Sequence, residues 1–194
     1  MNPKLRAILL NKFINVINIA INGNFPNGDN WSPVNGTESI GSNVYTLTGN
    51  GTSTSARAVG TSVGVKALNK KLFCRCLARV TNSSCTQIRF DIRTSSDAAA
   101  LIAATQLTPT QNIWYPLYGI VTVDATYMAV GQTELLPYIL HSYVDNATEN
   151  GKIMEIKEVM IIDLVNFSGK EPNAVQINEW FPNWFDGSIQ VIAK

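Results

Sequence analysis

The chain has 194 residues, of which 15% are charged and 45% hydrophobic, and its formal net charge is +1 at pH 7. This length suits one domain with a substantial core, with or without a short appendage. A net charge near zero creates no global field that would attract nucleic acid or an anionic membrane, and no apolar run is long enough to cross a bilayer. We therefore expect neither nucleic acid nor membrane as a partner.

Residues 1–15 form a separate amphipathic segment. Leu5, Ile8, Leu9 and Phe13 recur at helical spacing, which places them on one side of a short helix or arm. A lone helix of this length is marginal in water, so it should dock on something. It docks either on its own domain or on a partner subunit, and in the second case these four residues are an assembly arm.

From Val16 onward the pattern is that of β-strands. A turn-dense stretch covers residues 22–31, and short alternating runs separated by turn signals follow it, as in a sandwich or barrel. The predicted strands cover residues 44–48, 72–80, 87–93, 114–123, 136–143 and 153–164. Glu158 interrupts the apolar parity of the last strand, which indicates a bulge or an internally paired carboxylate. The alanine-rich residues 98–104 predict a short helical insertion.

The strands at residues 72–80 and 87–93 are predicted to form a hairpin, because each alternates cleanly and a polar turn lies between them. The outer side of this hairpin would carry Arg75, Arg79, Arg89 and Arg93. Guanidinium groups match phosphate oxygens, so this surface could grip a phosphate-bearing polymer such as teichoic acid. It could equally meet an acidic surface of a neighbouring subunit, or be a solvated surface with local ion pairs to Asp91.

No catalytic constellation stands out, and we expect no enzyme activity. His141 is the single histidine, and it lies in a strand where Ser142 points to the opposite side, so a Ser–His–Asp arrangement is not expected there. Cys74, Cys76 and Cys85 are too few for a disulfide framework or a four-ligand zinc site. We expect them to be reduced and buried.

Several short motifs occur in an order that resembles a known group of domains. They are Asn22–Phe25 followed by Trp31, Thr48–Thr52, Trp114–Tyr115, His141–Asp145, Ile162–Leu164, Glu171–Pro172 and Trp184–Gly187. Together they resemble jelly-roll carbohydrate-binding modules, and the domains found in tail, baseplate or fibre proteins of phages of Gram-positive bacteria. The chain departs from that pattern at residues 167–172, which are one residue shorter than usual, and in its longer N-terminal arm.

The resemblance implies an all-β fold: a jelly-roll β-sandwich over residues 16–165, with the arm at 1–15 and a short C-terminal helical tailpiece at 166–194. The aromatic residues expected to pin this tailpiece onto the sandwich are Trp180, Phe181, Trp184 and Phe185.

Glycan sites in β-sandwiches combine aromatic faces with polar groups that bind hydroxyls. The aromatic candidates are Trp114, Tyr118, Tyr138 and Tyr143, and the polar candidates are the four arginines of the predicted hairpin. For each aromatic side chain, a place in the core is the competing interpretation. The resemblance also implies a structural calcium, for which Asn24, Asp29 and Asp163 are the matching positions; we expect no other cofactor.

We therefore predict a bacteriophage virion structural protein, made in the host cytoplasm, that acts as a fibre, decoration or tail-adaptor subunit. Its partners would be other virion proteins, further copies of itself (a trimer is the first expectation) and host cell-surface polysaccharide. The alternative is a carbohydrate-binding accessory module of a cell-wall or polysaccharide hydrolase.

Overall fold

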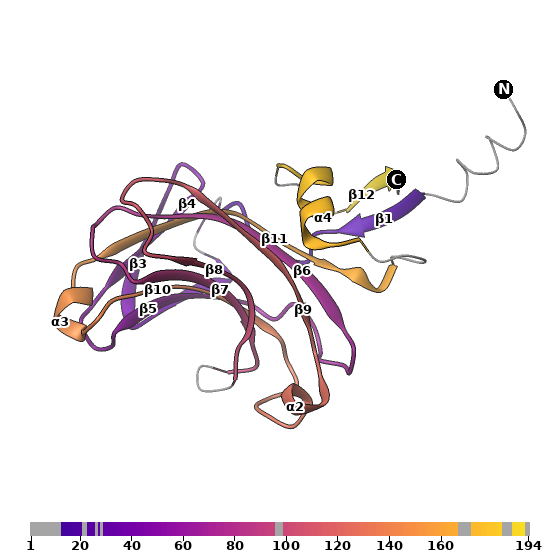
Figure 1. Cartoon of the computed structure of the whole chain (residues 1–194), viewed down its shortest axis with the longest axis horizontal. Coiled ribbons are helices and arrows are strands. Elements are labelled where there is room, and N and C mark those ends of the chain that lie inside the picture. Colours follow the sequence, from indigo (N-terminus) through magenta and orange to yellow (C-terminus); the bar gives the residue numbers. More distant parts are fainter. Residues whose placement is uncertain are drawn as a thin grey trace, which may run out of the picture.

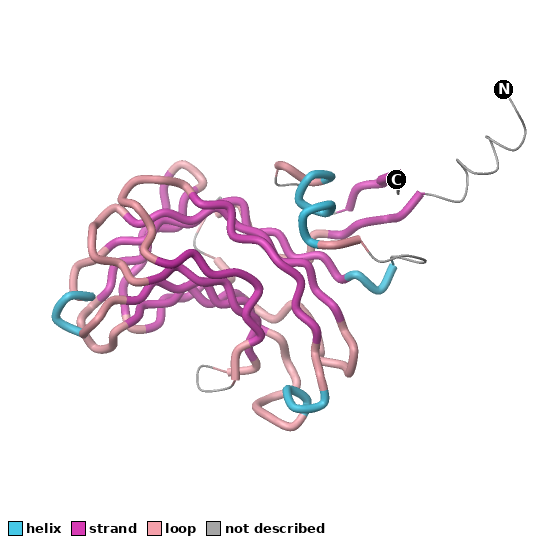
Figure 2. The backbone as a smooth tube through the Cα atoms, in the orientation of Figure 1, coloured by secondary structure: helices cyan, strands magenta, loops and turns pink. Residues whose placement is uncertain are grey.

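The computed structural model describes residues 13–20, 23–25, 27, 29–95, 99–166, 172–183 and 188–192. In this part of the chain two antiparallel five-stranded sheets pack face to face, which confirms the predicted all-β sandwich (Figure 1). Both sheets curve in the same direction, so the outward side of one is convex and that of the other is concave (Figures 1 and 2). We call them the convex sheet and the concave sheet.

The convex sheet contains, in spatial order, β3 (Gly36–Gly41), β4 (Val44–Gly49), β11 (Ile153–Asp163), β6 (Lys71–Val80) and β9 (Tyr115–Thr122). The concave sheet contains β2 (Trp31–Val34), β5 (Ser55–Gly60), β10 (Leu136–Ser142), β7 (Gln87–Arg93) and β8 (Leu101–Leu107). The short helical elements are α2 (Ala125–Met128), α3 (Asn146–Glu149), η1 (Leu164–Asn166) and α4 (Ala174–Trp180). Outside the sandwich, β1 (Phe13–Ile17) pairs with β12 (Ser188–Ile192). Within the ranges given above, no helix has the length and apolar character needed to span a bilayer.

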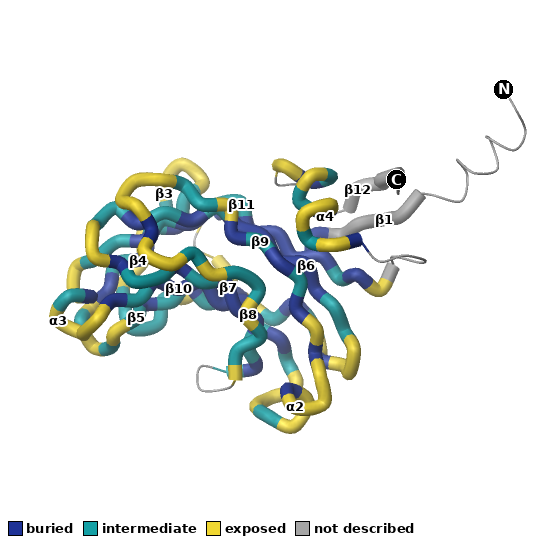
Figure 3. Tube along the Cα trace, in the orientation of Figure 1, coloured by how far each residue is buried: buried dark blue, intermediate teal, exposed yellow. Residues whose placement is uncertain are grey.

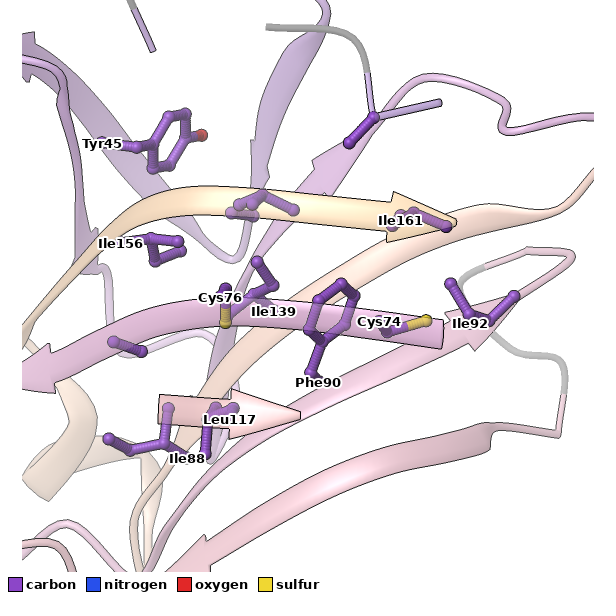
Figure 4. Packing of buried hydrophobic residues seen from close by; sticks show 14 of the residues in the cluster. Tyr45, Cys74, Cys76, Ile88, Phe90, Ile92, Leu117, Ile139, Ile156 and Ile161 are labelled. Carbon is purple, nitrogen blue, oxygen red and sulfur yellow. The ribbon is translucent and has the colours of Figure 1, made fainter. Parts of the chain in front are cut away.

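The main core lies between the two sheets. Alternate residues of β6 and β7 point into it and are fully buried: Leu72, Cys74, Cys76, Ala78 and Val80 from β6, and Ile88, Phe90 and Ile92 from β7. Figure 4 shows Cys74 and Cys76 together with the three residues of β7. The strands are the most buried part of the chain, whereas α2 and the connecting turns are largely exposed (Figure 3). The predicted alternation is therefore confirmed in both strands. All three cysteines are free and buried as predicted, and burial raises the pKa of the Cys74 and Cys76 thiols.

The predicted hairpin between β6 and β7 is wrong. β6 pairs with β11 and β9 in the convex sheet, whereas β7 pairs with β10 and β8 in the concave sheet. The connection at residues 81–86 therefore crosses from one sheet to the other. Alternation shows only that one side of each strand is buried, and this holds equally for neighbours in one sheet and for facing strands in two sheets.

The predicted helical insertion at residues 98–104 is also wrong where the structure describes it. β8 begins at Leu101 and pairs with β7, with Ala104 opposite Phe90. Alanine favours a helix by less than about 1 kcal/mol per residue, and pairing with an open sheet edge outweighs that preference.

A bulge at Glu158 lets β11 serve two separate cores. Glu158 has a φ of 55°, and the pairing of β11 with β6 shifts between Lys157 and Met160. Ile156, before the shift, belongs to the main core, whereas Met160 and Ile162 belong to a second cluster. The predicted bulge is confirmed. The expectation that the apolar residues of the whole strand share one side is wrong, because the extra residue of the bulge makes every later side chain point to the opposite side of the sheet.

The second cluster joins the tailpiece to the outward side of the convex sheet. It consists of Phe73, Met160, Ile162, Leu164, Ile177 and Phe181, with Trp180 packed against it. Helix α4 begins after Asn173, which forms a capping box with Gln176. The predicted pinning role is confirmed for Trp180 and Phe181, while Trp184 and Phe185 lie outside the described residues.

Arg75 adds polar contacts to this junction. Its Nε donates to Asn178 Oδ1 at 3.0 Å, and its Nη2 donates to the carbonyl oxygen of Pro182 at 2.7 Å. Its Nη1 lies 3.5 Å from the carboxylate of Glu158, and the side chain is only 5% exposed. Arg75 therefore connects β6, the bulge and the tailpiece.

We expect Arg75→Met to lower the free energy of unfolding by about 1–2 kcal/mol, because it removes these hydrogen bonds while keeping an apolar stem. Amide hydrogen exchange should become faster in α4 and stay unchanged in β7. Arg79→Met is the matched control on the same strand: the ion pair of Arg79 with Glu155 is partly exposed, so its loss should change stability by less than about 1 kcal/mol. Equal exchange rates in α4 of both variants would contradict the role of Arg75.

Candidate functional site

The outward side of the concave sheet gathers polar side chains in rows. Ala58, Ile139 and Phe90 are fully buried in the core, so their neighbours along β5, β10 and β7 point outward. Because paired residues share a side of the sheet, the register defines each row. The first row is Ser55, Ser142, Gln87 and Leu107; the second is Val34, Arg57, Leu140, Arg89 and Thr105; the third is Ser32, Val59, Tyr138, Asp91 and Ile102; and the fourth is Leu136 and Arg93. We call these residues the concave face.

Asp91 is the fixed centre of the concave face. Its Oδ2 accepts hydrogen bonds from Nε and Nη2 of Arg89 at 3.1 and 2.8 Å, and from Nε and Nη2 of Arg93 at 3.1 and 2.7 Å. Asp91 is fully buried, while the side chains of Arg89 and Arg93 are 20% and 11% exposed. The ion pairs to Asp91, which belong to one of the three alternatives that the sequence leaves open for this surface, are present. One carboxylate thus holds two guanidinium groups in place, and their combined charge exceeds its own.

Tyr138 and Leu140 form the floor beneath these arginines. The guanidinium carbon of Arg93 lies 5.4 Å from the centroid of the Tyr138 ring. Tyr138 and Leu140 are each only 3% exposed. The predicted aromatic candidate Tyr138 therefore lies on the concave face, where its ring supports Arg93 by a cation–π contact.

The predicted group of four arginines is divided between two sides of the molecule. Arg89 and Arg93 lie on the concave face, whereas Arg75 and Arg79 point outward from the convex sheet. The prediction that all four arginines share one surface is wrong, because it assumed that β6 and β7 form a hairpin in one sheet. Arg79 forms an ion pair with Glu155 on β11.

The other aromatic candidates lie elsewhere. Trp114 is partly buried beside the convex sheet, where Arg79 and Lys157 lie 4.7 and 4.6 Å from its ring centroid. Tyr118 lies opposite Arg75 in the register of β9 with β6, and it packs against the second cluster. Tyr143 is part of the main core and only 3% exposed. Of the four candidates, the structure brings only Tyr138 to the concave face.

Of the predicted arm at residues 1–15, the structure describes residues 13–15, and these belong to strand β1 and not to a helix. Phe13 begins β1 opposite Ile192. Leu5, Ile8 and Leu9 lie outside the described residues.

The positions proposed for calcium show no assembled site. Asp163 forms an ion pair with Lys70 at 3.2 Å, so an ammonium group already neutralises this carboxylate. Asp29 is exposed, and Asn24 is partly buried. Across the described ranges, no group of three or more His, Cys, Asp or Glu side chains could hold a metal ion. The structural calcium stays a prediction.

His141 has the surroundings of a core residue. It is fully buried, and burial lowers its pKa to about 4. Neither ring nitrogen has a hydrogen-bond partner among the described residues, and its ring packs edge-on against Tyr143 at 5.4 Å. No serine or cysteine in this part of the chain is therefore hydrogen-bonded to it as a nucleophile would be.

A pocket of about 350 Å³ lies between the β5–β6 connection and the end of β11. Its exposed apolar residues are Val65, Leu68 and Val165, and its acid, Asp163, is already paired with Lys70. The concave face offers fixed cationic donors instead, so we place the candidate site there.

No protein-family model matches this chain, and no curated protein matches it. Solved structures do share its fold. A CBM4 domain superposes with a TM-score of 0.53 at 9% identity, covering 72% of this chain and 98% of that chain. The N-terminal CBM22 tandem domain of Paenibacillus barcinonensis Xyn10C gives a TM-score of 0.55 at 14% identity, covering 76% of this chain and 50% of that chain.

An arabinose-bound GH51 α-L-arabinofuranosidase gives a TM-score of 0.55 at 11% identity, covering 77% of this chain. This chain spans only 27% of the length of that enzyme. At such identities the likeness shows the fold alone. The fold is the jelly-roll β-sandwich of carbohydrate-binding modules.

Sequence reasoning missed Arg57 and the strand that carries it. In β5 the buried positions are Ala56, Ala58 and Gly60, and such small side chains give a weak apolar signal. The alternation of these small residues with Ser55, Arg57 and Val59 was the available sign of a strand.

Proposed function

We propose that this protein binds glycan on the concave face of its β-sandwich. The observation that carries the proposal is the Arg89–Asp91–Arg93 network, which holds hydrogen-bond donors in fixed positions on the outward side of a curved sheet. Fixed donors lose little conformational entropy when they bind sugar oxygens. The likeness of the fold to carbohydrate-binding modules supports the same function.

The setting we propose is a bacteriophage particle, on which the protein is a fibre, decoration or tail-adaptor subunit. β1 and β12 lie beyond the convex sheet, on the side away from the concave face (Figure 1). Attachment through either strand would leave the concave face open to a host-surface polysaccharide. The same geometry supports the alternative equally: an accessory module that directs a hydrolase to its polysaccharide.

Selective blocking of the concave face tests glycan binding. The three native cysteines are buried, so a bulky maleimide would react with an exposed cysteine introduced by Thr105→Cys on β8. We expect the unmodified full-length protein to bind a polysaccharide in a panel of neutral and acidic polymers, and the labelled variant to bind at least about tenfold more weakly. Thr37→Cys on β3, labelled in the same way, is the control on the opposite sheet and should bind normally. Binding that survives the label at Thr105→Cys would place the site elsewhere.

The setting is tested by the mass of the protein in solution. A deletion of residues 1–12 leaves every described strand intact, because β1 begins at Phe13. For a virion subunit we expect a discrete oligomer at full length, with a trimer as the first expectation, and a folded monomer after the deletion. Monomers of equal stability in both cases would favour the accessory-module alternative.

A further inference from the structure

We propose that the ligand of the concave face is an acidic polysaccharide, and that Arg57, Arg89 and Arg93 recognise its carboxylate or phosphate groups. This inference rests on the proposed glycan-binding function and names the chemical class of the ligand.

The charge of the concave sheet is the first argument. Its five strands contain Arg57, Arg89, Arg93 and Asp91, and no other arginine, lysine, aspartate or glutamate. All four side chains belong to the outward rows: Arg57 on β5 and the other three on β7, with β10 between these two strands. Strands two apart in a sheet are separated by roughly 10 Å, so Arg57 and Arg89 flank the centre of the face in one row. The sheet therefore carries three guanidinium groups against one carboxylate.

The geometry of Arg89 is the second argument. Asp91 engages its Nε and Nη2, whereas its Nη1 makes no hydrogen bond within the described part of the chain. The guanidinium plane is thus fixed from below by a buried acid, and the 20% of the side chain that is exposed can face a ligand. Planar guanidinium groups match the oxygens of carboxylates and phosphates.

The third argument is the lack of an open aromatic ring on the five strands of this sheet. Their aromatic residues are Trp31, Phe90 and Tyr138, and none of them is more than 3% exposed. Recognition of a neutral glycan generally uses exposed aromatic faces against the apolar side of the sugar. The exposed apolar side chains in the outward rows, Ile102 and Leu107, are aliphatic, so charge and hydrogen bonds carry the recognition instead.

The three polar residues of the first row suit the hydroxyl groups of a sugar chain, and Leu107 ends this row at the sheet edge. Ser55, Ser142 and Gln87 lie next to the row of Arg57 and Arg89, and the Gln87 amide already donates to the Ser142 hydroxyl at 3.4 Å. A polymer with both hydroxyls and anionic groups would match the two rows together. An acidic protein surface would use the arginines but not this hydroxyl-binding row, so we favour a polysaccharide.

Calorimetric titration of the full-length protein tests the inference with four polymers. Polygalacturonate presents carboxylates, poly(glycerol phosphate) presents phosphates, and xylan and laminarin are neutral. We expect binding to at least one acidic polymer, weakened at least about tenfold by Arg89→Gln. Whether the carboxylate or the phosphate polymer binds identifies the anionic group.

Two further variants keep the test independent of folding. Arg89→Gln removes one partner of buried Asp91, so Arg57→Gln is measured beside it, because this change leaves both ion pairs of Asp91 intact. Arg57→Gln should also weaken binding at least about tenfold. The control is Lys71→Gln, which removes one positive charge from β6 in the convex sheet and should leave binding unchanged.

The other outcomes separate this inference from the proposed function. Binding to xylan or laminarin that both arginine variants retain would overturn the inference and leave glycan binding standing. No binding to any of a broad panel of acidic and neutral polymers would defeat the proposed function itself. An equal loss in Lys71→Gln would show a nonspecific charge effect. Equally tight, arginine-dependent binding of polyglutamate would indicate an acidic protein partner. Both of these last results would overturn the inference.

Discussion

Gly119→Ala is expected to lower the free energy of unfolding by about 3 kcal/mol or more. Gly119 lies on β9 opposite Cys74 and is buried. A Cβ at this position would overlap the backbone carbonyl oxygen of Ala103 on β8. β8 and β9 are edge strands of different sheets that lie side by side, so the clash can be relieved only by moving backbone. Urea denaturation of the full-length protein measures the loss.

Gly41→Ala is the matched control for this substitution. Gly41 ends β3, and a Cβ there would meet nothing within 4 Å. We expect the free energy of unfolding to change by less than about 0.5 kcal/mol. Similar losses in the two variants would mean that the close approach of β8 and β9 does not exist in solution.

The single histidine is expected to make the protein acid-sensitive. Burial lowers the pKa of His141 to about 4, whereas an exposed imidazole titrates near about 6.5. The folded state therefore binds fewer protons than the unfolded state between these values. The stability that this difference contributes is fully present above about pH 6.5, and about 3 kcal/mol of it is lost as the pH falls to 4.

His141→Leu isolates this effect, because the contributions of the acidic residues remain in both proteins. The unfolding free energy of the native protein, minus that of the variant, should fall steadily from pH 7 to pH 4. At pH 7 the variant should be at least as stable, since both ring nitrogens of His141 lack partners among the described residues. The chain has one histidine, so a single imidazole resonance can be followed by NMR. A midpoint near 6.5 would show that the ring is hydrated and not buried.

Part of the candidate site could be predicted from the sequence. The alternation of β7 predicts that Arg89, Asp91 and Arg93 point outward, whereas Tyr138 is a candidate only because it is aromatic. Arg57 was missed because its strand has only small buried side chains. Arg75 and Arg79 were wrongly predicted to share a surface with Arg89 and Arg93, because the alternation of side chains does not show which strands pair.

The sequence is sufficient to predict the all-β class, the inward residues of β6 and β7, the bulge at Glu158 and a short helical segment near Trp180 and Phe181. Each of these depends on residues that are close in the chain, so local periodicity and turn chemistry suffice to predict it. The structure is needed to show that β6 and β7 belong to opposite sheets. Arg89 and Arg93 therefore share a face with Arg57, while Arg75 contacts the tailpiece on the other sheet. Sheet membership depends on pairing between strands far apart in the chain, and side-chain alternation is the same on either side of a sandwich.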